Sequence, residues 1–260
     1  MTFINVNQIK IFYYDNKFKG IPLLFIHGWL GSSLEWAYQL FYFDYKNHII
    51  MFDLPGFGKS DKPNRVYSIE FFSDQIIDFL KLLGYNEIIL IGHSLGGLIA
   101  QNISIKKPKL VKKLILISSK AAVSPSIKEK YTLFLVNILF KLSYRNFLKK
   151  ILMQIISPKK KIREFRKLYN YSLKLPKTLV LRTFKNMTYK IKIKKETSNI
   201  SQLTLIIYGT EDRIISRENI IEVKDLIPNA KLKLIENGSH RVMYDEHLKV
   251  NEVIEKFINT

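Results

Sequence analysis

Short runs of apolar residues recur along the chain and predict the strands of a sheet. Most of these runs lack the polar–apolar alternation of a half-exposed strand, which is typical of strands buried on both faces. The predicted strands are 22–28, 48–54, 87–91, 113–118, 203–209 and 231–235. The segments 3–6 and 9–14 alternate instead and predict an antiparallel hairpin at the start of the chain.

Segments with helical spacing of apolar residues lie between these strands. Ser68 is a predicted N-cap with Glu70 in the first turn, and the helix that follows is predicted to end before Gly84. Further helices are predicted at 34–43, 98–103, 218–226 and 246–258. This alternation of strands and helices predicts an α/β fold with a mostly parallel sheet and helices on both of its faces.

The alternation stops from about residue 124 to residue 195, where helical patterns continue without a convincing strand. A chain of 260 residues is long enough for one large domain or for one domain with an inserted subdomain. We therefore predict a core formed by 1–123 and 196–260, with 124–195 as an inserted helical lid.

The six residues Gly92-His93-Ser94-Leu95-Gly96-Gly97 lie where a predicted strand meets a predicted helix. A serine flanked by glycines at such a turn is typical of the nucleophile elbow G-x-S-x-G. Glycine is favoured on both sides because the strained turn brings the backbone close to itself. The turn predicts Ser94 as a nucleophile and places the backbone N–H of Leu95 at a helix N-terminus, where a developing negative charge is stabilised. Short Gly/Ser runs also occur in ordinary turns, so the neighbouring strand and helix matter to this interpretation.

Two further candidates follow later strands, at the edge of a parallel sheet where functional loops gather. Asp212 lies in the loop after strand 203–209, and His240 lies in the loop after strand 231–235. Together with Ser94 they predict a triad in which His240 accepts the serine proton and Asp212 orients the imidazole. Glu211 remains an alternative acid, and each of the three could be an ordinary loop residue if taken singly.

Five segments together resemble the α/β-hydrolase superfamily: 27–29, 53–60, 92–97, 209–212 and 238–240. The resemblance implies that the backbone N–H of Trp29 is the second oxyanion donor beside that of Leu95. It implies a structural role for the turn 53–60. Some of these motifs are also similar to the carboxylesterases that cleave pimeloyl methyl ester on acyl carrier protein, a family that usually has Trp where this chain has His93.

The nucleophile type implies the class of reaction. Epoxide hydrolases and haloalkane dehalogenases of this superfamily carry Asp at the elbow, whereas a serine such as Ser94 implies an acyl-enzyme and the cleavage of carboxylic esters. A thioesterase or a C–C bond hydrolase on an acyl-carrier-bound or anionic substrate is the alternative on the same triad. A non-catalytic ligand receptor of the same fold is the alternative from another class.

The inserted segment differs from the rest of the chain in its charge. Residues 124–195 contain 20 Lys and Arg but only 2 Asp and Glu, and so carry +18 of the formal net charge of +20. This asymmetry predicts an acidic carrier protein or an anionic lipid surface as a partner, and a solvated lysine face is the simpler alternative. Nucleic acid is disfavoured because the triad indicates small-molecule chemistry. The candidate partner-binding residues are Lys159, Lys160, Lys161, Arg163, Arg166 and Lys167.

Composition adds few constraints. The chain has no cysteine, which excludes disulfides and thiolate metal sites. We expect neither a metal nor an organic cofactor, because a serine hydrolase needs none. The first residues show no basic region followed by a long apolar segment, so we expect a cytoplasmic protein.

Overall fold

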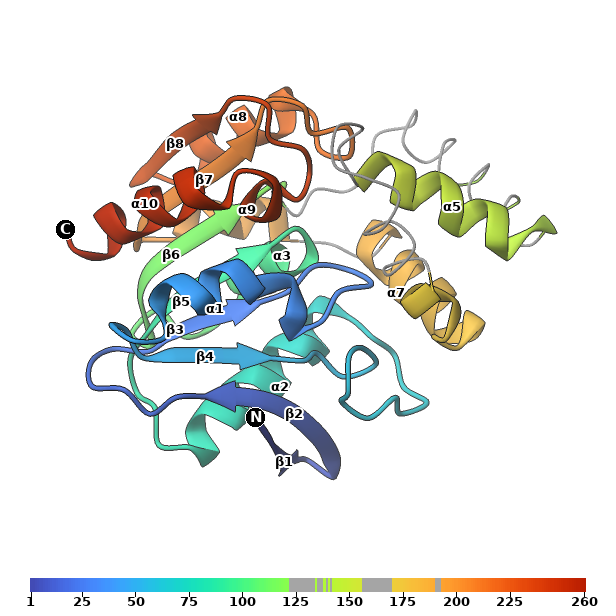
Figure 1. The fold of residues 1–260 in the computed structure, drawn as a ribbon, viewed down its shortest axis with the longest axis horizontal. Helices are drawn as coiled ribbons and strands as arrows, with labels where there is room; N and C mark the ends of the chain where they lie inside the picture. Colours follow the sequence, from blue (N-terminus) through green and yellow to red (C-terminus); the bar gives the residue numbers. More distant parts are fainter. Residues whose placement is uncertain (122–133, 135–137, 139, 141, 156–169, 190–192) are drawn as a thin grey trace.

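The protein is described here from a computed structural model that covers residues 1–121, 134, 138, 140, 142–155, 170–189 and 193–260. A twisted eight-stranded sheet runs through its centre (Figure 1), in the order β1-β2-β4-β3-β5-β6-β7-β8. The first two strands pair antiparallel, as do β2 and β4, and all later neighbours are parallel. The strands are β1 (Thr2–Val6), β2 (Ile9–Asp15), β3 (Leu23–Ile26), β4 (Ile49–Phe52), β5 (Ile88–His93), β6 (Val111–Ile117), β7 (Leu203–Gly209) and β8 (Ala230–Ile235).

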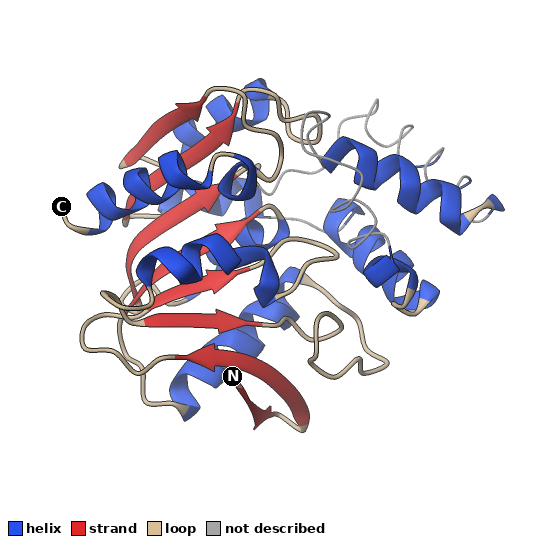
Figure 2. Ribbon diagram, viewed as in Figure 1, coloured by secondary structure: helices blue, strands red, loops and turns tan. Residues whose placement is uncertain are grey.

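Helices cover both faces of this sheet (Figure 2). Successive side chains of β3 illustrate the reason, since Leu24 and Ile26 enter one buried cluster while Leu23 and Phe25 enter the other. The first cluster lies under α2 (Ile69–Leu82), α3 (Leu95–Lys106) and α8 (Arg217–Leu226). The second lies under η1 (Ser33–Trp36), α1 (Ala37–Phe43), α9 (Val242–Asp245) and α10 (His247–Ile258). The predicted α/β architecture, a mostly parallel sheet with helices on both faces, is confirmed.

The predicted start and end of α2 also agree with the structure. Ser68 Oγ accepts a hydrogen bond from the backbone N–H of Phe71 at 3.1 Å, which satisfies one of the free donors of the first turn. At the other end Gly84 takes a φ of 78°, a conformation that glycine adopts without steric cost.

The described part of the predicted lid contains the helices α5 (Tyr144–Ile155) and α7 (Lys177–Tyr189), and the 3₁₀ segment η3 (Ile193–Asn199) runs across its predicted end at residue 195. Helix α5 buries Phe147, Leu148 and Leu152. In Figure 1 α5 and α7 lie beyond the carboxyl ends of the parallel strands. We call these two helices the cap, while the boundaries at 123/124 and 195/196 stay a prediction. Among the described residues, no helix is both long and apolar enough to cross a membrane.

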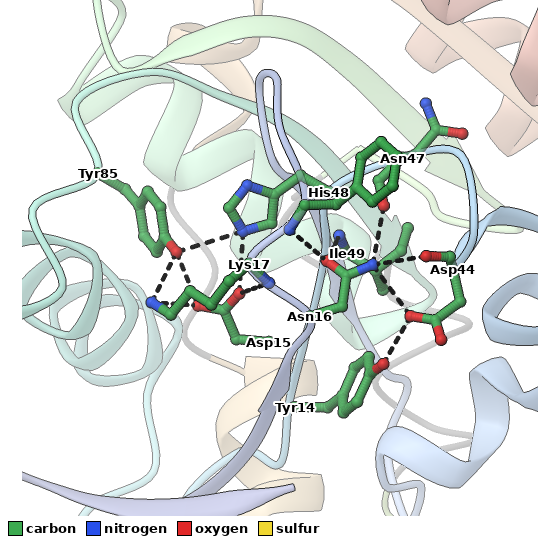
Figure 3. Close-up of polar contacts among 10 residues, drawn as sticks. Tyr14, Asp15, Asn16, Lys17, Asp44, Asn47, His48, Ile49 and Tyr85 are labelled. Atoms are coloured by element: carbon green, nitrogen blue, oxygen red, sulfur yellow. Dashed lines mark hydrogen bonds and ion pairs between the residues drawn. The ribbon is translucent and has the colours of Figure 1, made fainter.

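A polar network around the buried carboxylate of Asp15 lies at the amino end of β4 (Figure 3). This is the end of the parallel strands that faces away from the cap (Figure 1). Asp15 Oδ1 lies 2.9 Å from His48 Nε2, and Asp15 Oδ2 lies 2.8 Å from Lys17 Nζ and accepts from the Tyr85 hydroxyl at 2.7 Å. Burial alone would raise the pKa of Asp15, but the hydrogen bonds that it accepts hold the pKa below its usual value. Both oxygens of Asp15 thus have partners, and this network ties the end of β2 to the segment before β4.

Candidate active site

The turn between β5 and α3 has the strained backbone of a nucleophile elbow. Ser94 takes a φ of 51° and a ψ of −111°, which is unusual for a residue with a side chain. A Cβ atom on Gly92 would collide with the backbone of Gly96, and one on Gly96 would collide with the carbonyl of Ile26. These close approaches explain why glycine stands on both sides of the serine.

The three residues predicted as a triad lie together at the carboxyl ends of the parallel strands. His240 Nε2 lies 3.0 Å from Ser94 Oγ, and His240 Nδ1 lies 2.9 Å from Asp212 Oδ2. A carboxylate can only accept, so Nδ1 carries the proton and Nε2 is free to accept from the serine hydroxyl. This tautomer is the one in which the imidazole acts as a base toward Ser94.

Asp212 is held in place by its own loop. Its side chain is fully buried, and Oδ1 accepts hydrogen bonds from the backbone N–H groups of Ile214 at 2.8 Å and Ile215 at 3.0 Å. Burial on its own would raise the pKa of Asp212, but His240 and the two N–H groups lower the pKa below its usual value. The carboxylate is therefore charged and oriented before any substrate binds.

The segments that carry Trp29 and Leu95 flank Ser94. Leu95 is the first residue of α3, and a Cβ atom on Gly28 would lie 3.4 Å from Ser94 Cβ. The peptide that joins Gly28 to Trp29 is therefore next to the candidate nucleophile. The assignment of the two N–H groups as oxyanion donors stays a prediction.

His27 shapes the turn after β3. Its Nδ1 lies 2.7 Å from the carbonyl oxygen of Gly28, and its Nε2 lies 3.1 Å from the backbone nitrogen of Leu54. The carbonyl must accept and the N–H must donate, so the ring is neutral with its proton on Nδ1. His27 thus joins the loop after β3 to the loop after β4 and does not point a reactive nitrogen at Ser94.

Asp53 organises the turn 53–60. Its Oδ1 accepts from the backbone N–H of Ser33 at 2.5 Å, and its Oδ2 accepts from that of Lys59 at 2.9 Å. Ser60 Oγ donates to the carbonyl of Asp53 at 2.6 Å. These contacts hold the turn 53–60 together and tie it to the first residue of η1, which is the kind of structural role that the resemblance implied.

The side chain of Trp29 reaches from the core into the cap. Its indole N–H donates to Thr183 Oγ1 at 2.8 Å, and its ring centroid lies 5.4 Å from that of Phe184 and 6.5 Å from that of Phe147. Phe147 belongs to α5 and the other two to α7. One residue therefore has its backbone beside Ser94 and its side chain between both cap helices.

A buried ion pair beside the candidate triad was not predicted. His93 Nδ1 pairs with Glu35 Oε1, and His93 Nε2 lies 2.8 Å from the carbonyl oxygen of His240. The sequence placed His93 inside the elbow as a packing or hydrogen-bonding residue, but offered no signal for Glu35. A single acid at the start of an apolar helical segment is indistinguishable from a surface residue until the tertiary contacts are known.

The six basic residues predicted to bind a partner, 159–161, 163, 166 and 167, lie outside the described residues. The part of the cap that is described exposes further cations on α5 and α7: Arg145, Lys149, Lys150, Lys177, Arg182 and Lys185. Within the described ranges of the chain, no three His, Asp or Glu side chains are grouped so that they could hold a metal ion.

Comparison with known proteins shows the family to which this site and fold belong. A family model described as the alpha/beta hydrolase fold matches residues 21–133. The chain is 32% identical over 253 residues to the pimeloyl-[acyl-carrier protein] methyl ester esterase of Wigglesworthia glossinidia brevipalpis, with 92% of this chain and 93% of that protein covered. The chain belongs to the α/β-hydrolase superfamily, and it is a hydrolase.

Other similar proteins have names that cover several kinds of chemistry. Epoxide hydrolase 1 of Caenorhabditis elegans is 27% identical over 281 residues, with 99% of this chain and 70% of that protein covered. Two solved structures share the fold with TM-scores of 0.90, each 22% identical and covering 100% of this chain and 99% of its own: an esterase from Exiguobacterium antarcticum and a bromoperoxidase from Bacillus anthracis.

Proposed function

We propose that the protein cleaves carboxylic esters through an acyl-enzyme on Ser94. The observation that carries the proposal is the position of His240, whose two ring nitrogens lie 3.0 Å from the serine hydroxyl and 2.9 Å from the Asp212 carboxylate. A nucleophile, a base and a group that orients the base within hydrogen-bonding distance form the arrangement that acyl transfer requires.

The reaction follows from these contacts. Ser94 Oγ attacks the ester carbonyl carbon while its proton moves to His240 Nε2, and the negative charge of Asp212 stabilises the imidazolium that forms. When the tetrahedral intermediate collapses, the C–O bond to the alcohol breaks and the imidazolium returns the proton to the departing oxygen. Water then attacks the acyl-enzyme by the same route, which releases the carboxylic acid and restores the Ser94 hydroxyl.

The backbone N–H groups of Trp29 and Leu95 are the proposed oxyanion donors. Leu95 opens α3, so its N–H is one of the amides that have no acceptor within the helix. Donors fixed before the reaction stabilise the oxyanion without reorganisation, and loss of one such donor costs roughly 10²- to 10³-fold in turnover in hydrolases of this kind.

The nucleophile favours ester over epoxide chemistry despite the epoxide hydrolases among the relatives. The family resemblance implies Asp at the elbow of epoxide hydrolases, and this chain has Ser94. The esterase relative, whose name specifies a methyl ester on an acyl carrier protein, is similar over 92% of this chain. Thioesters and activated C–C bonds are cleaved by the same triad chemistry and are the alternative substrates.

The partner is part of the proposal. Residues 124–195 carry +18 of the net charge, and the cations on α5 and α7 are exposed. A surface of one sign attracts and orients a partner of the other sign. We therefore retain an acidic carrier protein or an anionic lipid surface as the partner of the cap.

The test is hydrolysis of a p-nitrophenyl ester combined with a fluorophosphonate probe. We expect the wild type to turn over and to be labelled at Ser94, and Ser94→Ala to lose both while it melts at an unchanged temperature. Ser201→Ala, at an exposed serine far along the sequence, is the matched control and keeps both properties. Labelling at another serine overturns the assignment of the nucleophile, and a folded wild type with no turnover on ester, thioester or C–C substrates favours the receptor alternative.

A further inference from the structure

Glu35 and His93 form an ion pair in the interior, behind the candidate triad. Their side chains are 7% and 4% exposed, and Glu35 Oε1 contacts His93 Nδ1. Burial alone would raise the pKa of Glu35, but the charge of His93 and its hydrogen bond lower the pKa to about 2. A buried carboxylate is costly unless it is paired and hydrogen-bonded, so this pair needs an explanation.

Two oxygen acceptors face the ring nitrogens of His93. Nδ1 faces the carboxylate of Glu35, and Nε2 lies 2.8 Å from the carbonyl oxygen of His240. Both partners only accept hydrogen bonds, so His93 serves both of them only when each ring nitrogen carries a proton. A neutral ring would lose one of the two contacts.

The first contact reaches the base. His93 Nε2 holds the main chain of His240, the residue whose ring lies 3.0 Å from Ser94 Oγ, and the centroids of the two imidazole rings are 4.9 Å apart. His240 stands in the loop between β8 and α9. A hydrogen bond from a charged donor is about twice as strong as a neutral one, so it fixes the position of a loop carbonyl well.

The second contact reaches the other side of the site. Glu35 Oε2 accepts a hydrogen bond from the backbone N–H of Gly28 at 3.3 Å. A Cβ atom on Gly28 would lie 2.7 Å from His93 Nδ1, so the loop packs directly on the pair. The next residue in this loop is Trp29, the proposed oxyanion donor.

We propose that Glu35 and His93 are positioning residues that set the base and the oxyanion loop at a fixed separation on either side of Ser94. The inference rests on the proposed function. His93 belongs to the elbow itself, so the pair connects three segments: the nucleophile turn, the loop of the base and the loop of the proposed oxyanion donor. Neither side chain hydrogen-bonds to Ser94 Oγ or to a ring nitrogen of His240, and their hydrogen bonds to the site are to the main chain of His240 and Gly28.

A purely structural pair exists in the same molecule and provides the matched control. Asp15 and His48 are also a buried carboxylate and a histidine, with side chains 2% and 7% exposed and 2.9 Å between Oδ1 and Nε2. Asp15 and His48 lie at the amino end of β4 (Figure 3). Ser94 follows the carboxyl end of β5, and β4 and β5 both run parallel to β3, so the two pairs stand at opposite ends of the parallel strands.

The experiment compares Glu35→Gln, His93→Gln, the double variant and Asp15→Asn. For each we measure kcat and KM on a p-nitrophenyl ester, with active sites counted by fluorophosphonate labelling, and the melting temperature. We expect Glu35→Gln to lower kcat per labelled site by roughly 10- to 100-fold with KM within twofold, because small misplacement of reacting groups is costly.

The double variant leaves no unpaired buried charge and should lose no more kcat than the worse single variant. Asp15→Asn should melt at a lower temperature with kcat unchanged.

Equal kcat per labelled site in Glu35→Gln and wild type overturns the proposal. A loss of kcat in Asp15→Asn as large as that in Glu35→Gln also overturns it.

A second readout does not depend on turnover. It uses ¹⁵N spectra of the histidine rings, in which the His93 signals are assigned by their disappearance in His93→Gln. We expect two protonated nitrogens on His93 at neutral pH in the wild type and only one in Glu35→Gln, and a singly protonated His93 in the wild type contradicts the inference. Absence of wild-type turnover together with a doubly protonated His93 counts against the proposed ester chemistry and leaves the pair in place.

Discussion

Asp212 and Glu211 are neighbours with the same charge, and Asp212 lies against the imidazole. Its Oδ2 is 2.9 Å from His240 Nδ1. Asp212→Asn offers an amide that can orient the ring in the wrong tautomer and cannot stabilise the imidazolium. We expect kcat to fall on the order of 10⁴-fold, the loss known for a triad Asp that loses its charge. Glu211→Gln is the control and should change kcat only a few-fold. A larger effect of Glu211→Gln would make Glu211 the acid.

The buried carboxylate of Glu35 makes the fold sensitive to acid. Its pKa is about 2 in the folded chain, against an ordinary value of 4.5 when unfolded. Because the folded pKa is the lower one, the unfolded chain binds the proton first, and the stabilisation is complete above pH 4.5 and lost as the pH falls toward 2. The shift corresponds to on the order of 3 kcal/mol.

The measurement is the free energy of unfolding in urea between pH 7 and pH 2.5. We expect the wild type to lose more stability over this range than Glu35→Gln, whose side chain does not titrate. Parallel curves for the two proteins contradict the prediction. Asp212, whose folded pKa is also below its usual value, contributes with the same sign in both proteins.

For single residues, the sequence predicts those that stand in a recognisable motif or after a predicted strand. It does not predict residues whose role depends only on tertiary contacts. The strained turn at Ser94 could be predicted because the glycines that it needs are close to Ser94 in the sequence. The positions of Asp212 and His240 near Ser94 could be predicted because both lie in loops that follow parallel strands. Glu35 gave no signal, because its partners His93 and Gly28 come from other segments and only the folded chain brings the three together.

Among the elements, strands were easier to predict than short helices. Buried strands such as β7 stand out as continuous apolar runs, and the predicted range 203–209 is the observed one. The predicted helix 34–43 begins in the structure as a 3₁₀ turn, Ser33–Trp36, beside the loop that Asp53 holds through the N–H of Ser33. Helix α9 has only four residues, too few for an apolar period to be visible.

The cap and the core meet at Trp29, which yields a prediction about their contact. Trp29→Phe keeps an aromatic ring against Phe147 and Phe184 but removes the N–H that donates to Thr183. Thr183→Val removes the acceptor and keeps the volume. Each should lower the free energy of unfolding by about 1 kcal/mol, the usual net value of one hydrogen bond, and kcat/KM should fall because the backbone of Trp29 is beside Ser94.

The double variant separates this hydrogen bond from simple packing. Both single variants remove the same bond, so the effects on stability should be less than additive. Fully additive losses indicate that the indole N–H and the threonine hydroxyl act independently, which contradicts a shared contact between core and cap.

For the whole molecule, the charge is concentrated in one segment, and that makes salt a useful probe. Attraction between exposed charges is screened over a Debye length of roughly 8 Å at physiological salt. Reversal of several charges among Lys159, Lys160, Lys161, Arg163, Arg166 and Lys167 should raise KM for an acyl-carrier or anionic-vesicle substrate. The same change should leave kcat on a small neutral ester nearly unchanged, because that ester is not guided by charge.

Added salt provides the matching comparison. On the large substrate it should reproduce the effect of the charge reversal, and on the small ester it should have little effect. If both substrates respond alike to mutation and to salt, these basic residues only keep the inserted segment soluble, and the proposed ester chemistry is unaffected.

The order of the segments has a consequence for engineering. Ser94 and the whole of β1–β6 precede the inserted segment, whereas Asp212, His240, β7 and β8 follow it. A chain divided inside the insertion would give two fragments, each with only some of the reacting groups, that meet along the parallel ladder between β6 and β7. Ester turnover would then require the fragments to reassociate. If the two fragments were fused to two proteins that bind one another, they would form a complementation reporter. Release of p-nitrophenol from the ester would then measure the binding of the two proteins.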